Sequence, residues 1–283
     1  PPKYDTTFVK FKGGFLGVEI DDYWGIIDFQ NNEIIPLKYD DLNLFIDNLA
    51  LVELDEKYGF INQKEEYVIP LKYDFAGEFV EEAAKIMLDG QLGYINKEGE
   101  ETFFEEYVRF HGFNEGLSGV RDKTHDKFGY INRSHDVVIP FRYDFAQNFL
   151  NGLASVEIDG KYGIINTQGE EVIPIKYDSI TSHSDTTFDD GLIAVELDGK
   201  WGYINLKDEI EIPLQYQSAG EFYKGYANVQ QNDRWGIINL KGEEVIPAKY
   251  ESIFSLFENG IACIMHKGAI GYIDEQGNEY FED

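Results

Sequence analysis

The sequence predicts an all-β chain built from eight short antiparallel repeats. The first observation is a near repetition: "GLASVEIDGKYGIINTQGEEVIPIKYD" begins at Gly152, and "GLIAVELDGKWGYINLKDEIEIPLQYQ" begins at Gly191. The second is that apolar residues alternate over short runs, the period of a β-strand. The third is that Asp-Gly and other turn signals separate these runs, and no stretch keeps a helical period.

One glycine marks each repeat, and the spacing between successive marker glycines is 34, 34, 36, 34, 39, 34 and 35 residues. We expect residues 1–283 to form a single array of eight units. The units are centred on Gly25, Gly59, Gly93, Gly129, Gly163, Gly202, Gly236 and Gly271. A tyrosine recurs in step with them, at Tyr39, Tyr73, Tyr107, Tyr143, Tyr177, Tyr216 and Tyr250.

Each unit is expected to be a three-stranded antiparallel meander followed by a packed loop. The fifth unit shows the order: a strand over residues 153–158, a type I′ turn at Asp159-Gly160, and a second strand over 161–166. Asn166 then begins another turn, and the third strand ends at Pro174, because proline donates no ladder hydrogen bond. The marker glycine indicates close approach of a neighbouring backbone, and such short units must stack to bury their apolar faces.

The repeats resemble the WG family, also called KWG. The pattern "DGKWGYIN…G…VIP…YD" is nearly complete in residues 159–178 and 198–217, and a literal Trp-Gly pair occurs at Trp24, Trp201 and Trp235. The resemblance covers the whole chain. It implies a bacterial repeat module within a larger protein, and it transfers no catalytic residue, because the family has no agreed ones.

Two architectures fit eight small antiparallel units. An open superhelix, or solenoid, of about eight three-stranded meanders is favoured over an eight-bladed β-propeller-like ring. Propeller blades usually contain about 40–50 residues and four strands. Most of these units span 34 residues, and the spacing varies up to 39, which an open stack absorbs more easily.

The charge balance restricts the partners. Lys and Arg number 24 against 53 Asp and Glu, a net charge of −29, which repels nucleic acid and favours a basic partner. No apolar run is long enough for membrane insertion. The single cysteine, Cys263, fits a reducing, cytoplasmic compartment. The chain begins "PPKYD" without Met, so a trimmed, secreted or surface protein stays an alternative.

Candidate chemical sites are few. The five histidines do not repeat at metal-ligand spacing with Cys263 or with one another, and no phosphate-binding glycine loop opens a helix. We therefore expect no enzyme activity, no metal and no cofactor. The repeated aromatics are expected to pack in the core rather than form ligand cages.

Binding residues are expected where the repeat breaks, because insertions in repeat arrays map to loops on one face. The third unit replaces the recurrent proline with Phe104 and continues with Arg109, Phe110 and His111. The fourth unit lengthens its first hairpin at His125, and the fifth adds "SHSDTT", which contains His183.

The favoured function is a non-enzymatic repeat scaffold that binds a protein or peptide partner. A carbohydrate or cell-wall binding module is the alternative that aromatic-rich repeats indicate. A carbohydrate-active enzyme with acids and tyrosines in a cleft is less favoured, because catalysis needs one asymmetric constellation and the repeat distributes its residues evenly.

Overall fold

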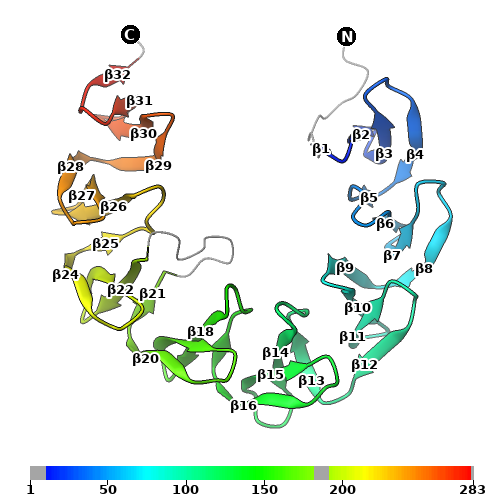
Figure 1. Ribbon diagram of the computed structural model, residues 1–283. Helices are drawn as coiled ribbons and strands as arrows, with labels where there is room; N and C mark the ends of the chain where they lie inside the picture. Colours follow the sequence, from blue (N-terminus) through cyan, green and yellow to red (C-terminus); the bar gives the residue numbers. More distant parts are fainter. Residues whose placement is uncertain (1–10, 182–190, 282–283) are drawn as a thin grey trace. The chain divides into compact units, whose positions relative to one another are not determined.

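The computed structural model describes residues 11–181 and 191–281, and every regular element in these ranges is a β-strand. The strands form eight four-stranded sheets, none closed into a barrel, coloured in chain order in Figure 1. The chain divides into two compact units, one of residues 1–126 and 130–136 and the other of residues 127–129 and 137–283. The predicted all-β repeat fold is confirmed; the single array of residues 1–283 and its open form stay predictions.

The first unit contains three whole sheets, in each of which consecutive strands are neighbours. The first sheet consists of β1 (Phe11–Lys12), β2 (Phe15–Ile20), β3 (Tyr23–Asp28) and β4 (Glu33–Tyr39). The second consists of β5 (Asp41–Leu42), β6 (Ala50–Leu54), β7 (Lys57–Ile61) and β8 (Tyr67–Tyr73). The third consists of β9 (Phe75–Val80), β10 (Ala83–Leu88), β11 (Gln91–Asn96) and β12 (Glu101–Phe104).

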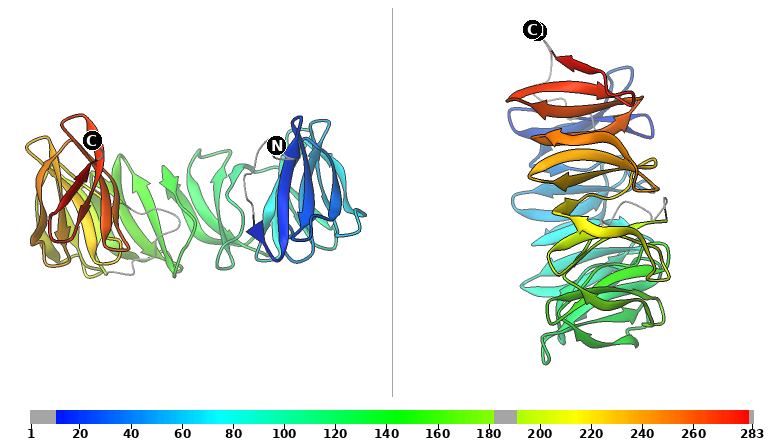
Figure 2. Two further views of the ribbon diagram at one scale, coloured as in Figure 1. Left: turned by 90° about the horizontal axis from the view of Figure 1, so that it is seen from above. Right: turned by 90° about the vertical axis from the view of Figure 1, so that its left-hand side faces the viewer.

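The fourth group of strands is divided between the units and consists of β13 (Tyr107–Phe110), β14 (Leu117–Asp122), β15 (Phe128–Asn132) and β16 (Val137–Tyr143). Four further sheets belong to the second unit, where they stack one on the next from green to red in Figure 2. They are β17 (Phe145–Ala146), β18 (Leu153–Ile158), β19 (Lys161–Asn166) and β20 (Glu171–Tyr177); β21 (Ser179–Ile180), β22 (Ile193–Leu197), β23 (Lys200–Ile204) and β24 (Ile210–Tyr216); β25 (Ser218–Ala219), β26 (Tyr226–Gln231), β27 (Arg234–Asn239) and β28 (Glu244–Tyr250); and β29 (Ser252–Glu258), β30 (Ile261–His266), β31 (Ala269–Asp274) and β32 (Glu279–Phe281).

The turns follow the predicted chemistry. Asp159 and Gly160, between β18 and β19, have φ of 51° and 74°, the positive values of a type I′ hairpin. In the next turn the Asn166 side chain accepts hydrogen bonds from the backbone N–H of Gln168 and Glu170, both at 3.0 Å. Gly169 closes this turn with a φ of 80°. Local sequence therefore determines both connections of the meander.

The marker glycine does allow a close backbone approach. A Cβ built at Gly59 would lie 2.8 Å from the carbonyl oxygen of Ile69 and 2.8 Å from the backbone nitrogen of Leu71. Both atoms flank Pro70 in β8, the strand beside β7, and the register between these strands shifts at this point. The glycine therefore makes room for the irregular, proline-containing neighbour in the same sheet.

The prediction that the third strand ends at its proline is wrong. β20 continues past Pro174 to Tyr177, because an outer strand leaves its missing N–H on the unpaired side of the sheet. The next residues, expected as a loop, form a fourth strand of two residues, β21, whose Ser179 and Ile180 pair with Glu196 and Val195 of the following sheet. The three predicted strands are thus present, and a short one precedes them.

Apolar cores lie between successive sheets of each unit. One core joins Phe60, Ile69 and Tyr73 of the second sheet to Ala84 and Ile86 of the third. The repeated tyrosines and phenylalanines are buried in such cores, as predicted; they include Tyr39, Tyr73, Tyr143, Tyr177, Tyr216, Tyr250, Phe45, Phe79, Phe113, Phe149, Phe222 and Phe257. Stacking therefore supplies the burial that one small sheet cannot achieve alone.

Candidate functional site

Two polar contacts recur where one sheet meets the next. The first, which we call the tyrosine clamp, is made by a Lys-Tyr pair at the end of an outer strand and a carboxylate of the next repeat. At the junction of the second and third sheets, Glu101 accepts hydrogen bonds from Tyr73 Oη and Lys72 Nζ, both at 2.5 Å. These two donors lower the pKa of Glu101, Lys72 with the larger effect. Burial, and then the adjacent Glu101, raise the pKa of Tyr73.

Equivalent clamps occur in both units. Lys38 and Tyr39 contact Glu65, and Lys249 and Tyr250 contact Glu279. In the fifth repeat Lys176 and Tyr177 share Asp208. At each of these junctions the tyrosine and one acid therefore contact each other and serve a structural role.

The second recurrent contact, the aspartate bridge, uses the residue after the clamp tyrosine. Asp74 accepts a hydrogen bond at 2.6 Å from Lys57 of the preceding sheet and another at 2.7 Å from the backbone N–H of Asp89 in the following hairpin. These donors lower the pKa of Asp74, Lys57 first. In the second unit Lys161 and the backbone N–H of Asp198 contact Asp178 in the same way.

At the junction between the third sheet and β13–β14, all within the first unit, both contacts are replaced. We call this place the third junction. Gln91 stands where the bridge has lysine, and Val108 stands where it has aspartate. Glu106 replaces the clamp lysine, and His135 replaces the clamp acid; Tyr94 Oη lies 3.0 Å from His135 Nε2 instead.

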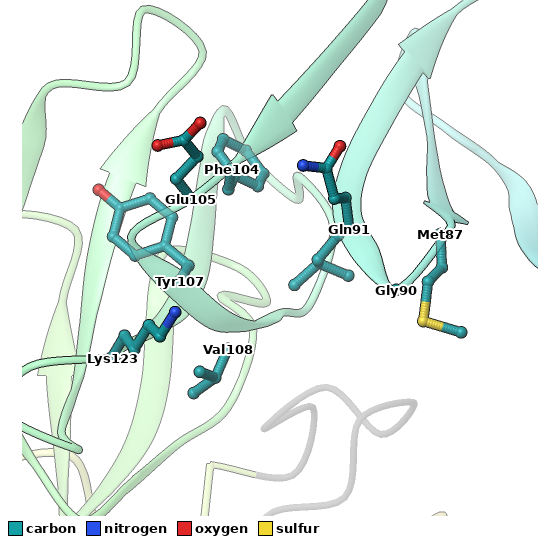
Figure 3. A pocket seen from close by; sticks show the side chains of 9 residues that line it. Met87, Gly90, Gln91, Phe104, Glu105, Tyr107, Val108 and Lys123 are labelled. Carbon is teal, nitrogen blue, oxygen red and sulfur yellow. The ribbon is translucent and has the colours of Figure 1, made fainter.

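A cavity of about 560 Å³ opens at this junction, between β10–β12 and β13. Figure 3 shows Met87, Gly90 and Gln91 on one side and Tyr107, Val108 and Lys123 on the other. Leu92, Phe104 and Glu105 complete its lining. Val108 is 49% exposed, at the position where Asp40, Asp74, Asp144 and Asp178 stand in other repeats. The cavity therefore occupies the corner that the aspartate bridge fills elsewhere, and we call it the junction cavity.

The predicted residues of the third repeat come together here, in two environments. Phe104 and Phe110 are buried, with ring centroids 5.2 Å apart, and both pack on Tyr94. Phe104 also lines the junction cavity. Phe110 is a core residue rather than a contact surface, because only 1% of it is exposed.

Arg109 and His111 form the polar part of the third junction, together with Lys85 of β10. Arg109 is exposed in β13, and His111, half-buried, follows that strand. Burial is the main cause that lowers the pKa of His111 to about 4, and the charges of Lys85 and Arg109 lower it further. Burial and then Arg109 also lower the pKa of Lys85. The positive charges of Lys85 and Arg109 therefore both disfavour protonation of His111, and the charge of Arg109 disfavours protonation of Lys85.

His125 has a structural contact in the lengthened hairpin, outside the junction cavity. Its backbone N–H donates to Asp122 at 2.6 Å, and its ring Nδ1 lies 2.5 Å from the same carboxylate oxygen. The side chain is otherwise exposed. His183 lies outside the described residues.

Sequence reasoning missed four residues of this site: Lys85, Gln91, Val108 and Lys123. The signal was present, because aligning the repeats places Gln91 and Val108 at the two positions of the aspartate bridge. The sequence alone does not reveal that these two positions contact each other, so the loss of the bridge could be recognised only from the fold.

The comparisons with known proteins agree with this repeat structure. The family model "WG containing repeat" matches residues 24–58, 58–91, 128–162, 162–201, 201–235 and 235–268. These matches cover most of the chain, so the protein belongs to the WG-containing repeat family. The unmatched stretch between residues 91 and 128 includes β12, β13 and β14, which form part of the third junction. No curated protein matches the sequence.

The solved structures that are similar are β-propeller-like repeat proteins. A crystal structure of a eukaryotic initiation factor is 10% identical, with a TM-score of 0.59, covering 100% of this chain and 90% of that one. Hsv2p of Kluyveromyces lactis is 10% identical, with a TM-score of 0.42, covering 79% of this chain and 88% of that one. At such identity the likeness shows the fold alone.

Two further findings apply to residues 11–181 and 191–281. No helix there is long and apolar enough to cross a membrane. In the same ranges, no group of three or more His, Cys, Asp or Glu side chains is arranged to hold a metal ion.

Proposed function

We propose that this chain is a non-enzymatic scaffold that binds a protein or peptide partner at the junction cavity, as a module of a larger bacterial protein. One observation carries the proposal: the cavity lies where both recurrent inter-sheet contacts are replaced. Neutral drift of one exposed residue would leave the rest of the junction intact. Here four positions differ together from the residues that form the recurrent contacts: Gln91, Val108, Glu106 and His135. The result is a cavity rather than a repacked core.

The size and lining of the cavity suit a few side chains of a peptide. Ligand pockets typically measure about 300–1,000 Å³ and combine apolar walls with a small number of polar groups. Met87, Leu92 and Val108 supply apolar surface. Gln91, Glu105 and Lys123 supply polar groups that would orient a bound segment.

The acids and tyrosines of the regular junctions support binding over catalysis. Glu101 and Glu279 both have pKa values lowered by a lysine and a tyrosine, so they remain ionised and accept hydrogen bonds. A general acid needs the opposite shift, toward neutral pH. Their partners Tyr73 and Tyr250 have raised pKa values and stay protonated.

The test closes the cavity with residues that the repeat itself uses. Gln91→Lys with Val108→Asp recreates the aspartate bridge seen at Lys57 and Asp74, without changing the net charge. Peptides selected from a random display library against the native chain should bind the closed variant at least about tenfold more weakly, since the loss of one or two buried side-chain contacts is worth that much.

The matched control opens a bridge in the second unit by Lys161→Gln with Asp178→Val and should leave peptide affinity unchanged. The proposal fails if the selected peptides bind the closed variant as tightly as the native chain.

A further inference from the structure

The third junction contains three basic residues, Lys85, Arg109 and His111. The first two stand at positions where the other repeats carry no cation. Lys85 lies in the first long strand of its sheet, on the face toward the next sheet. The equivalent positions of the other repeats carry uncharged residues: Gly17, Leu51, Gly119, Ser155, Ala194, Asn228 and Cys263. The positions equivalent to Arg109 carry Asp41, Phe75, Phe145, Ser179, Ser218 and Ser252. No other repeat places a cation at either position.

Pairing in the sheets brings these groups to one place. Arg109 lies directly opposite Arg121 in the β13–β14 register. The backbone N–H of His111 donates to the carbonyl of Gly119 at 3.0 Å, and a Cβ built at Gly119 would lie 3.1 Å from His111 Nδ1. Lys85 approaches from the facing strand β10, two residues from Met87 of the cavity lining.

Within the described ranges, an ion pair is formed by only one of the lysine and arginine side chains of this cluster. Arg121 pairs with Asp126 at 2.9 Å, but neither Lys85 nor Arg109 forms an ion pair with a residue in 11–181 or 191–281. The nearest recorded partner of Lys85 is the Phe75 ring, 5.7 Å from Nζ. Half-burying a lysine beside an arginine opposes folding. In a chain with 53 acids and 24 bases, two cations that form no ion pair in the described ranges are unexpected at one junction unless an anion completes the site.

We propose that Lys85, Arg109 and His111 form an oxyanion-binding site beside the junction cavity, suited to a carboxylate or a phosphate group. The guanidinium of Arg109 offers a planar fork that matches two oxygens of either group, and Lys85 adds a point charge from the opposite sheet. His111 supplies a ring N–H donor, which the neutral imidazole carries on one of its two nitrogens. The site goes beyond the proposed function and does not depend on it, because a free anion would bind whether or not a peptide does.

The test uses inorganic phosphate and acetate as probes at an ionic strength held constant with sodium chloride. The His111 ring signals in NMR spectra of the native chain should shift saturably with phosphate or acetate, and the melting temperature should rise in parallel. The probe that acts at the lower concentration identifies the preferred oxyanion. Lys85→Ser and Arg109→Ser, which introduce residues found at equivalent positions, should each weaken this binding by about tenfold.

Lys64→Ser is the matched control, since it removes one exposed positive charge from another turn of the same unit. It should retain the native affinity within about twofold. The inference is overturned if neither probe gives a saturable shift, or if both junction variants, folded by circular dichroism, bind phosphate and acetate as the native chain does.

Discussion

Two neighbouring junctions of the first unit are built from the same repeat but differ in how their charged side chains are paired. The second junction lies between the second and third sheets, and the third junction lies between the third sheet and β13–β14. At the second junction Lys72, Lys57 and their acid partners neutralise one another. At the third, Gln91 and Val108 leave the corner hollow, while Lys85 and Arg109 add positive charge and form no ion pair within residues 11–181 and 191–281.

The comparison shows how a repeat array can acquire a site without changing its fold. The strands around the third junction keep their order, and the Phe104–Phe110 cluster keeps the sheets together. Loss of the ion pairs then creates space with only a small decrease in the free energy of unfolding, because exposed ion pairs contribute little stability. Four experiments compare the two junctions, given from the largest expected effect on the free energy of unfolding to the smallest.

Gly59→Ala should cause the largest loss. The new Cβ would lie 2.8 Å from two backbone atoms of β8, which cannot move without breaking the sheet. We expect the free energy of unfolding to fall by about 3 kcal/mol, the upper range for overpacking. Gly119→Ala at the third junction meets only the His111 side chain at 3.1 Å, and it should lose less than about 1 kcal/mol. Urea unfolding of the two variants would contradict the comparison if they lost equal stability.

Tyr73→Phe removes the tyrosine clamp of the second junction. Its hydroxyl donates to a carboxylate in a buried setting, so we expect a loss of about 1–2 kcal/mol by chemical denaturation. Tyr94→Phe, the matched change at the third junction, loses a contact with the His135 imidazole rather than with a carboxylate, and its free energy of unfolding should fall by about 0.5–1 kcal/mol. A larger loss for Tyr94→Phe would show that the third junction is the more tightly held.

His111 should make stability depend on pH. Its pKa is about 4 in the folded chain against an ordinary 6.5, so the unfolded chain binds the proton more readily. The contribution of His111 is therefore complete above pH 6.5 and is lost as the pH falls toward 4. The charged groups that lower its pKa are Lys85 of β10 and Arg109 of β13, both cationic.

An NMR titration of the His111 ring measures this shift directly. In Lys85→Ser the pKa of His111 should rise toward 6.5, although only in part, because burial is the larger cause. An unchanged His111 pKa in Lys85→Ser would show that Lys85 does not interact with His111.

Lys57→Gln with Asp74→Val transfers the third junction's residues to the second and should have the smallest effect on the melting temperature. Both side chains of the pair are substantially exposed, and such pairs contribute little. The doubly substituted chain should gain a hollow at the second junction, detectable as binding of a small apolar probe. A large drop in melting temperature would show that the aspartate bridge is a main stabilising contact.

The sequence was sufficient for the features that local chemistry controls. Asp159-Gly160 predicts its hairpin because both residues need positive φ, and the marker glycines predict a close approach because they lack Cβ. The fourth strand, such as Ser179–Ile180, was missed because two residues show no alternation. Phe104, Arg109 and His111 were found as breaks in the repeat. Lys85 and Val108 were not, because their significance depends on which residue of the neighbouring sheet they face.

The proline in the outer strands has a consequence for how the chain behaves in a crowded solution. Pro36, Pro70, Pro140, Pro174, Pro213 and Pro247 lie in the exposed edges β4, β8, β16, β20, β24 and β28. An edge with a missing N–H and a shifted register is a poor template for a strand from another molecule, so these sheets are protected against edge-to-edge aggregation. β12 carries Phe104 instead and pairs with β11 without a register shift, which leaves a flat, unguarded edge beside the junction cavity. The same departure that opens the junction cavity therefore also leaves an edge of the sheet open to self-association.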